Sequence, residues 1–150
     1  MTQRPPAPDF SPSASLSVAA PDAHAAAPFA GLAPAAVWQH FATLCAIPRA
    51  SKAEAPLRDL ILRRVRERGL AATVDAAGNL LVRKPASPGR AGAPGVILQA
   101  HLDMVCQKNA ASAHDFARDP IRPRRRDGWL VAEDTTLGAD NGIGVALILA

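Results

Sequence analysis

A histidine and an aspartate, His101 and Asp103, follow directly after the apolar run at residues 95–98. Side chains alternate between two faces in an extended chain, so these two point to the same side. Open α/β sheets place their sites just beyond the carboxyl ends of buried strands. A metal-binding imidazole usually donates its second ring N–H to a carboxylate. Taken alone, the pair fits either half of a metal site or a core histidine that is satisfied by a neighbouring carboxylate.

A second candidate is Asp140, which lies in the glycine-rich segment GADNGIG at residues 138–144. The spacing G-x-x-x-G-x-G, with no Lys-Ser/Thr after it, meets neither nucleotide-binding fingerprint. An aspartate at the start of a helix can be a plain N-cap. The glycines, however, indicate close backbone approach or unusual dihedral angles around this carboxylate. A carboxylate placed in this way could bridge two cations, and the segment alone leaves both interpretations open.

Two amphipathic helices are predicted ahead of these residues. The first begins at Pro34, a favourable first helical residue, and ends before Pro48. Its apolar residues recur at helical spacing, at Val37, Phe41, Leu44 and Cys45. The second follows SKAE at residues 51–54, which resembles a capping box, and stops at Gly69. Its apolar stripe consists of Leu57, Leu60, Ile61 and Val65.

The pattern then changes to short strands. Residues 71–74 and 80–82 form a predicted hairpin around the turn DAAGN. Residues 96–100 are a continuous apolar run, as in a strand that is buried on both faces. A further strand is expected at residues 129–132, and a hydrophobic helix follows the GADNGIG segment. The succession of elements predicts an α/β fold.

Length and composition favour one globular domain, since the chain has 150 residues of which 49% are hydrophobic. Residues 1–31, rich in Ala, Pro and Ser, are predicted to be a disordered extension, and residues 32–150 to be the folded part. The last residues form an apolar helix that stops without a cap, so we expect the chain to be part of a longer protein. No apolar stretch is long enough to span a membrane, no signal peptide is recognisable, and two cysteines form no disulfide framework, so a cytoplasmic location is expected.

The net charge of +4 arises from arginine, with the densest run at residues 122–126. Such a run could follow a phosphate backbone. It lies in a proline-containing stretch between elements, however, so we expect a solvated loop. Aromatic residues make up only 4% of the chain and include no tyrosine, which argues against a stacking platform for single-stranded nucleic acid.

Three segments occur in a fixed order, QAHLDMVCQKN at 99–109, HDFARDPI at 114–121 and TTLGADNGIG at 135–144. Together they resemble the aminoacyl-histidine dipeptidases, also called cytosol non-specific dipeptidases. These belong to a two-zinc superfamily with carnosinases, aminoacylases and carboxypeptidases. The similarity extends back through GNLLVRKP at 78–85 and VWQHFATLCAIP at 37–48, and so covers nearly everything after the N-terminal extension.

The resemblance implies a fold and a set of roles. The fold would be the N-terminal portion of an α/β catalytic domain with a central mixed sheet flanked by helices. His101 would be a terminal ligand to one zinc ion, and Asp140 would bridge both ions. Asp103 would be the catalytic aspartate that orients the imidazole without binding metal. The peptide bond after Asp140 would be cis, and Asp134 stands where a glycine is expected.

The implied function is hydrolysis of dipeptides, Xaa-His and broader, by a water that bridges two zinc ions, with manganese or cobalt as alternatives. The expected partner is the dipeptide substrate, with no nucleic acid or membrane, and a homodimer is compatible. The resemblance puts the remaining ligands and the general base beyond Ala150, so we expect the 150-residue chain to bind zinc poorly and to hydrolyse nothing. The alternatives are an amidohydrolase or deacylase of N-acyl amino acids and a non-catalytic basic binding module.

Overall fold

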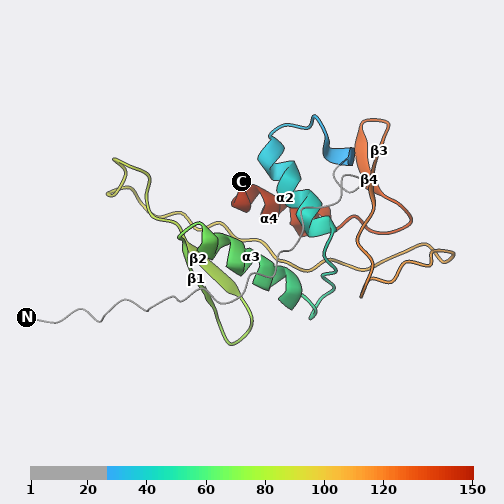
Figure 1. Ribbon diagram of the computed structural model, residues 1–150, viewed down its shortest axis with the longest axis horizontal. Helices are drawn as coiled ribbons and strands as arrows, with labels where there is room; N and C mark the ends of the chain where they lie inside the picture. The colour runs from blue at the N-terminus through green and yellow to red at the C-terminus, as the bar shows by residue number, and fades with distance from the viewer. Residues whose placement is uncertain (1–26) are drawn as a thin grey trace, which may run out of the picture.

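The computed structural model describes residues 27–150, in which helices and short strands alternate along the chain (Figure 1). In chain order the elements are η1 (Ala27–Phe29), α2 (Ala35–Cys45), α3 (Ala55–Glu67), β1 (Ala71–Val74), β2 (Leu80–Arg83), β3 (Pro123–Arg126), β4 (Trp129–Ala132) and α4 (Ala139–Leu149). This mixture confirms the predicted α/β class. Within residues 27–150, no helix combines the length and apolar character needed to cross a membrane.

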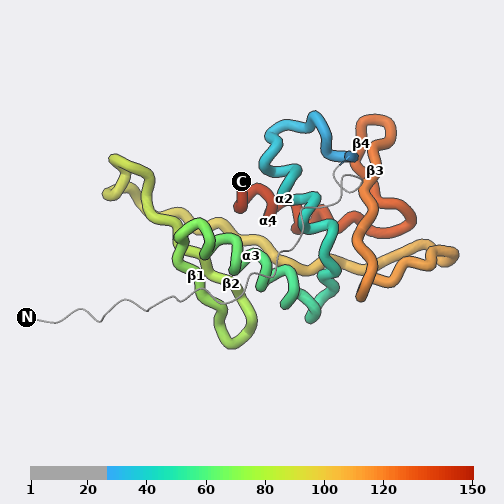
Figure 2. The backbone as a smooth tube through the Cα atoms, viewed as in Figure 1, coloured from blue at the N-terminus to red at the C-terminus, as the bar shows by residue number. Residues whose placement is uncertain are grey.

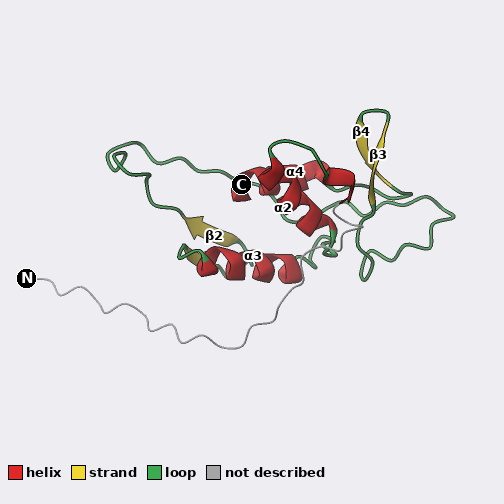
Figure 3. Ribbon diagram, turned by 45° about the horizontal axis from the view of Figure 1, so that its top comes forward, coloured by secondary structure: helices red, strands yellow, loops and turns green. Residues whose placement is uncertain are grey.

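Helices α2 and α4 pack against each other and enclose the core (Figures 1 and 3). The predicted apolar stripe of α2 is buried, and Phe41 is completely inaccessible to solvent. Its counterpart on α4 is Ala146, also fully buried, whose small side chain lets the two helices approach closely. This packing fixes α4, and with it the segment that carries Asp140, against the N-terminal half of the described chain.

Helix α3 ends as predicted but begins differently. Gly69 adopts a left-handed φ of 74°, and the amide of Leu70 donates to the carbonyl of Val65, so the helix closes with a Schellman motif. The predicted capping box at residues 51–54 is wrong, because the cap position before Ala55 is Glu54 and no side chain caps the helix. The hydroxyl of Ser51 instead bonds to Asp103.

The strands form two separate hairpins in the described part of the chain, in place of one central sheet. β1 pairs with β2 in the predicted antiparallel arrangement, and Asp75 closes the turn by accepting bonds from the amides of Ala77 and Asn79. β3 pairs with β4, so the prediction of a loop at the arginine run is wrong for residues 123–126. The cause is the dipeptide Asp127-Gly128, whose two positive φ angles make a tight hairpin turn.

The strand predicted at residues 96–100 is not formed. The stretch from residue 84 to 122 runs as a long irregular segment across the molecule, yellow to orange in Figure 2. Val96 and Ile97 are 82% and 92% exposed. A strand needs a neighbouring strand to satisfy its backbone, but within residues 27–150 each hairpin pairs only with itself. The predicted strand, and its burial on both faces, are therefore wrong for this structure.

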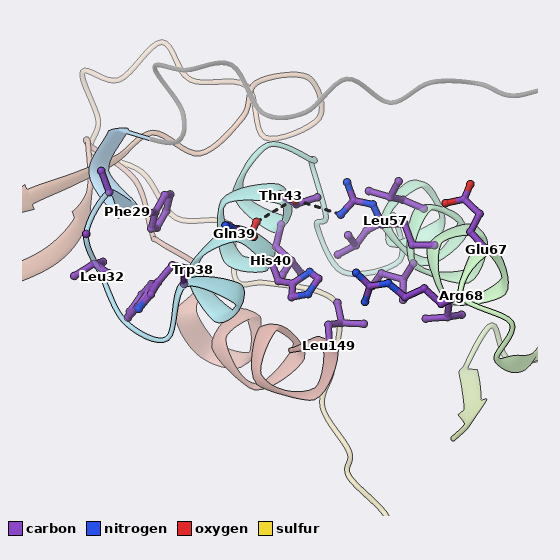
Figure 4. A pocket seen from close by; sticks show the side chains of 18 residues that line it. Phe29, Leu32, Trp38, Gln39, His40, Thr43, Leu57, Glu67, Arg68 and Leu149 are labelled. Carbon is purple, nitrogen blue, oxygen red and sulfur yellow. Dashed lines mark hydrogen bonds between the residues drawn. The ribbon is translucent and has the colours of Figure 1, made fainter. Parts of the chain in front are cut away.

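The N-terminal extension lies mostly outside the described residues, which start at residue 27. The η1 turn (Ala27–Phe29) is ordered, and Phe29 is buried against the rings of Trp38 and Phe41. The described structure thus starts before the boundary expected at residue 32. A hollow of about 800 Å³ lies between α2, α3 and the end of α4, with His40 and Leu149 in its wall (Figure 4). His101, Asp103 and Asp140 do not line it.

Candidate metal centre

The structure brings the three predicted site residues together around the imidazole of His101. Its Nδ1 lies 2.9 Å from Oδ1 of Asp103, and its Nε2 lies 3.1 Å from Oδ1 of Asp140. Asp140 is 39 residues further along the chain. One imidazole therefore lies between two carboxylates that the fold delivers from separate segments.

The segment that carries His101 and Asp103 is held by the residues just after α2. Met104 forms a parallel bridge with Ala50, and its amide donates to the carbonyl of Arg49 at 3.1 Å. The hydroxyl of Ser51 donates to Oδ2 of Asp103, the carboxylate oxygen that does not face His101. Asp103 is thus fixed at both oxygens. This role of Ser51 was not predicted from the sequence, because the SKAE pattern at residues 51–54 resembles a helix cap.

Asp140 lies on irregular backbone at the start of α4. Its φ and ψ are −88° and 109°, Asn141 is also non-helical, and regular helix follows. The peptide bond between these two residues is cis, as the resemblance implies. The N-cap interpretation of Asp140 is wrong, because the cap position is Gly138 and the carboxylate of Asp140 caps no backbone N–H among the described residues. Apart from its contact with His101, the Asp140 side chain is open, at 95% exposed.

The electrostatics of the group follow from these contacts. Partial desolvation lowers the pKa of His101, but hydrogen bonds with Asp140 and Asp103 outweigh it and hold this pKa above its ordinary value. The hydrogen bond from Ser51 holds the pKa of Asp103 below its ordinary value, with a further contribution from His101. Asp103 therefore stays an anion beside the imidazole through the neutral range.

The donor atoms fit a divalent cation. Zinc lies about 2.0–2.2 Å from nitrogen and oxygen ligands, so two ligands on one tetrahedral ion are about 3.3 Å apart. The separation of 3.1 Å between Nε2 of His101 and Oδ1 of Asp140 is close to this value. Asp103 on Nδ1 is the carboxylate that commonly orients a metal-binding histidine. Residues 27–150 contain no cluster of three or more His, Cys, Asp or Glu arranged to hold a metal, so the described donors make an incomplete ligand set.

A second set of contacts anchors the chain between these two segments. The hydroxyl of Thr136 donates to the carbonyl of Val105 at 2.6 Å, and its amide donates to the carbonyl of Gln107 at 2.8 Å. Asp134, which stands where the resemblance expects glycine, has a left-handed φ of 56°. Its carboxylate accepts a bond from the side-chain amide of Asn109 at 2.9 Å. Asp134 thus keeps the glycine-like turn and gains a hydrogen bond.

Known proteins share this arrangement of elements. The chain is 48% identical over 119 residues to the cytosol non-specific dipeptidase of Escherichia coli (strain K12), a match that covers 79% of this chain and 24% of that protein. The chain is related to the cytosol non-specific dipeptidases. The crystal structure of the aminoacylhistidine dipeptidase from Vibrio alginolyticus matches with a TM-score of 0.78 and 48% identity, over 79% of this chain and 24% of that one. The Vibrio alginolyticus protein therefore has the same fold as this chain over the matched part.

The match covers only part of each dipeptidase. The chain spans about a quarter of the length of either relative. No family model matches the chain. The relationship therefore concerns the elements and segments described above.

Proposed function

We propose that this chain supplies part of a metal centre that hydrolyses dipeptides. The observation that carries the proposal is the position of His101 between Asp103 and Asp140. The relatedness to proteins named as dipeptidases supports the choice of substrate class. Zinc is the proposed metal, with two ions in a complete site, and manganese or cobalt are alternatives because imidazole and carboxylate ligands accept several divalent ions.

Each described residue has a separate role in this proposal. His101 would bind metal through Nε2, and Asp140 would bind through its exposed carboxylate and bridge both ions. Asp103 would accept a hydrogen bond from the Nδ1–H group, which keeps the Nε2 lone pair available for the metal. The bound ions would lower the pKa of a shared water and polarise the scissile carbonyl. Further ligands and a general base must come from outside the described residues.

Several finer points belong to the same proposal. A preference for Xaa-His dipeptides and a cytoplasmic location are supported by the names of the two relatives. Specific binding of nucleic acid is not part of it, because two of the four arginines in the run contact other parts of the fold. Arg124 pairs with Glu133 at 2.6 Å, and Arg125 donates to the carbonyls of Pro28 and Ala30.

A chimaera tests the substrate class. The segment of the Escherichia coli dipeptidase that matches this chain is replaced by the 119 matched residues. Hydrolysis of free dipeptides is compared with hydrolysis of N-acyl amino acids, with and without a chelator. We expect chelator-sensitive cleavage of dipeptides, whereas cleavage of N-acyl amino acids alone would favour a deacylase.

The 150-residue chain provides a complementary test. With an incomplete ligand set it is expected to bind zinc weakly and to leave dipeptides intact. Dipeptidase activity of the purified chain that is lost with a chelator would contradict this expectation.

A further inference from the structure

Arg49 is the most unusual residue of the described core. It is 1% exposed, yet no carboxylate forms an ion pair with it within residues 27–150. Its Nε atom is buried without a hydrogen-bond partner. A guanidinium stays charged in proteins, and a buried charge without a counterion is costly. The reason for burying this charge is therefore sought in the hydrogen bonds of its two Nη atoms.

The guanidinium connects the two segments that carry the candidate ligands. Nη1 donates to the carbonyls of Leu102 and Asp103 at 3.0 and 3.3 Å, next to His101 in the chain. Nη2 donates to the carbonyl of Gly138 at 2.6 Å, two residues before Asp140. These bonds reach 53 to 89 residues along the chain, so one rigid planar group fixes the backbone on both sides of the site.

The glycines of the GADNGIG segment make room for this group. A Cβ atom added at Gly142 would lie 2.9 Å from Nη2 of Arg49 and 2.8 Å from the ring of Phe41. One added at Gly138 would collide with the same Nη2 and lie 2.8 Å from Sδ of Met104. All of these distances are shorter than a Cβ atom tolerates without movement of its neighbours. The close approach that the glycines indicated in the sequence is therefore an approach to the guanidinium of Arg49.

From this geometry we infer that Arg49 is a positioning residue that sets the separation between the His101 imidazole and the Asp140 carboxylate. It acts through backbone carbonyls and touches neither side chain's metal-binding atom. The inference rests on the proposed function only in taking a metal ion as the ligand of the imidazole and the carboxylate. Lysine cannot replace arginine in this role, because an ammonium is a point donor without the planar fork that spans both segments.

The test compares Arg49→Lys and Arg49→Met with the wild-type 150-residue chain by NMR. The first readout, without metal, is the NOE between the imidazole of His101 and the β-protons of Asp140. The second is the concentration of Co²⁺ that half-broadens the His101 imidazole resonances. Arg66→Lys is the matched control, because Arg66 also donates to a backbone carbonyl, at 3.2 Å from Ala72, but at the surface. Circular dichroism and melting temperature report folding.

We expect both Arg49 variants to lose the NOE and to need roughly 10-fold more Co²⁺, as when an outer-sphere partner of a metal ligand is removed. Arg49→Met is expected to stay folded, because removing a charge that is buried without a counterion opposes the cost of leaving three carbonyls without a donor. A folded variant with an unchanged NOE and unchanged Co²⁺ response would overturn the inference. Unfolding of both variants would also overturn it, because the role would then be in folding.

The two readouts separate this inference from the proposed function. If Co²⁺ leaves His101 of the wild-type chain unaffected, the incomplete ligand set binds the metal too weakly for the second readout, and the metal-binding proposal is decided by the zinc content of the chimaera. The metal-free NOE comparison would still decide whether Arg49 positions the two side chains.

Discussion

Replacing Gly138 with alanine probes the contact between the glycine-rich segment and the guanidinium beneath it. Gly138 has a left-handed φ of 69°, and an added Cβ would meet Nη2 of Arg49 and Sδ of Met104. Two costs are therefore expected. The left-handed conformation costs an alanine about 1–2 kcal/mol, and forcing a methyl group into a packed site adds about 1–3 kcal/mol.

The matched control is Gly69→Ala at the end of α3. Gly69 has a φ of 74°, and nothing lies within 4 Å of an added Cβ. The control therefore carries the conformational cost of about 1–2 kcal/mol without the packing cost. The difference between the two variants isolates the close approach at Gly138.

The assay is urea unfolding followed by circular dichroism, with the free energy of unfolding taken by linear extrapolation at matched m-values. Gly138→Ala is expected to be less stable than Gly69→Ala by about 1–3 kcal/mol. Equal losses in the two variants would refute the close contact. The close approach of the glycine-rich segment to Arg49, and the position of Arg49 between the two segments, would then be wrong.

Two further predictions concern groups outside the site. Burial, followed by the charges of Arg68 and Arg64, holds the pKa of His40 below its ordinary value of 6.5, so the contribution of His40 to stability declines as the pH falls below 6.5. Arg68→Gln should move the NMR titration midpoint of His40 upward. A wild-type midpoint above 6.5 would be inconsistent with the packing around His40. Burial raises the pKa of Cys45 to about 12 and raises the pKa of the less buried Cys106 as well, and iodoacetamide at mildly alkaline pH should modify Cys106 first because it is the more accessible thiol. Equal modification of both thiols in the folded chain, measured by mass spectrometry, would contradict this.

The sequence predicted correctly those helices and helix ends that depend on neighbouring residues. The stripe from Val37 to Cys45 predicted α2, and Gly69 predicted the end of α3, because burial at helical spacing and a left-handed cap are read from neighbouring residues. The exposed run at residues 96–100 was predicted wrongly, because a strand depends on a partner that local composition does not describe. The strand in the arginine run was missed, although Asp127-Gly128 is a recognisable hairpin turn.

The sequence pointed to the polar side chains of the candidate site but not to the residues that hold them in place. His101, Asp103 and Asp140 stand in two motifs, and the resemblance assigned their roles; the structure brings the three side chains together, and the roles stay predictions. Arg49 was not identified, because it binds backbone carbonyls, which every residue has and no sequence pattern marks. Ser51 was assigned to a local cap, whereas its partner Asp103 lies 52 residues away.

The most direct test of the metal centre is the zinc content and dipeptidase activity of the chimaera with Asp140→Asn. Asp59→Asn is the control, since Asp59 is an exposed carboxylate that pairs only with the neighbouring Arg58 in the described structure. We expect the chimaera and the control to bind two zinc ions and cleave dipeptides, and Asp140→Asn to lose both zinc and activity. Full zinc content and full activity in Asp140→Asn would contradict this expectation.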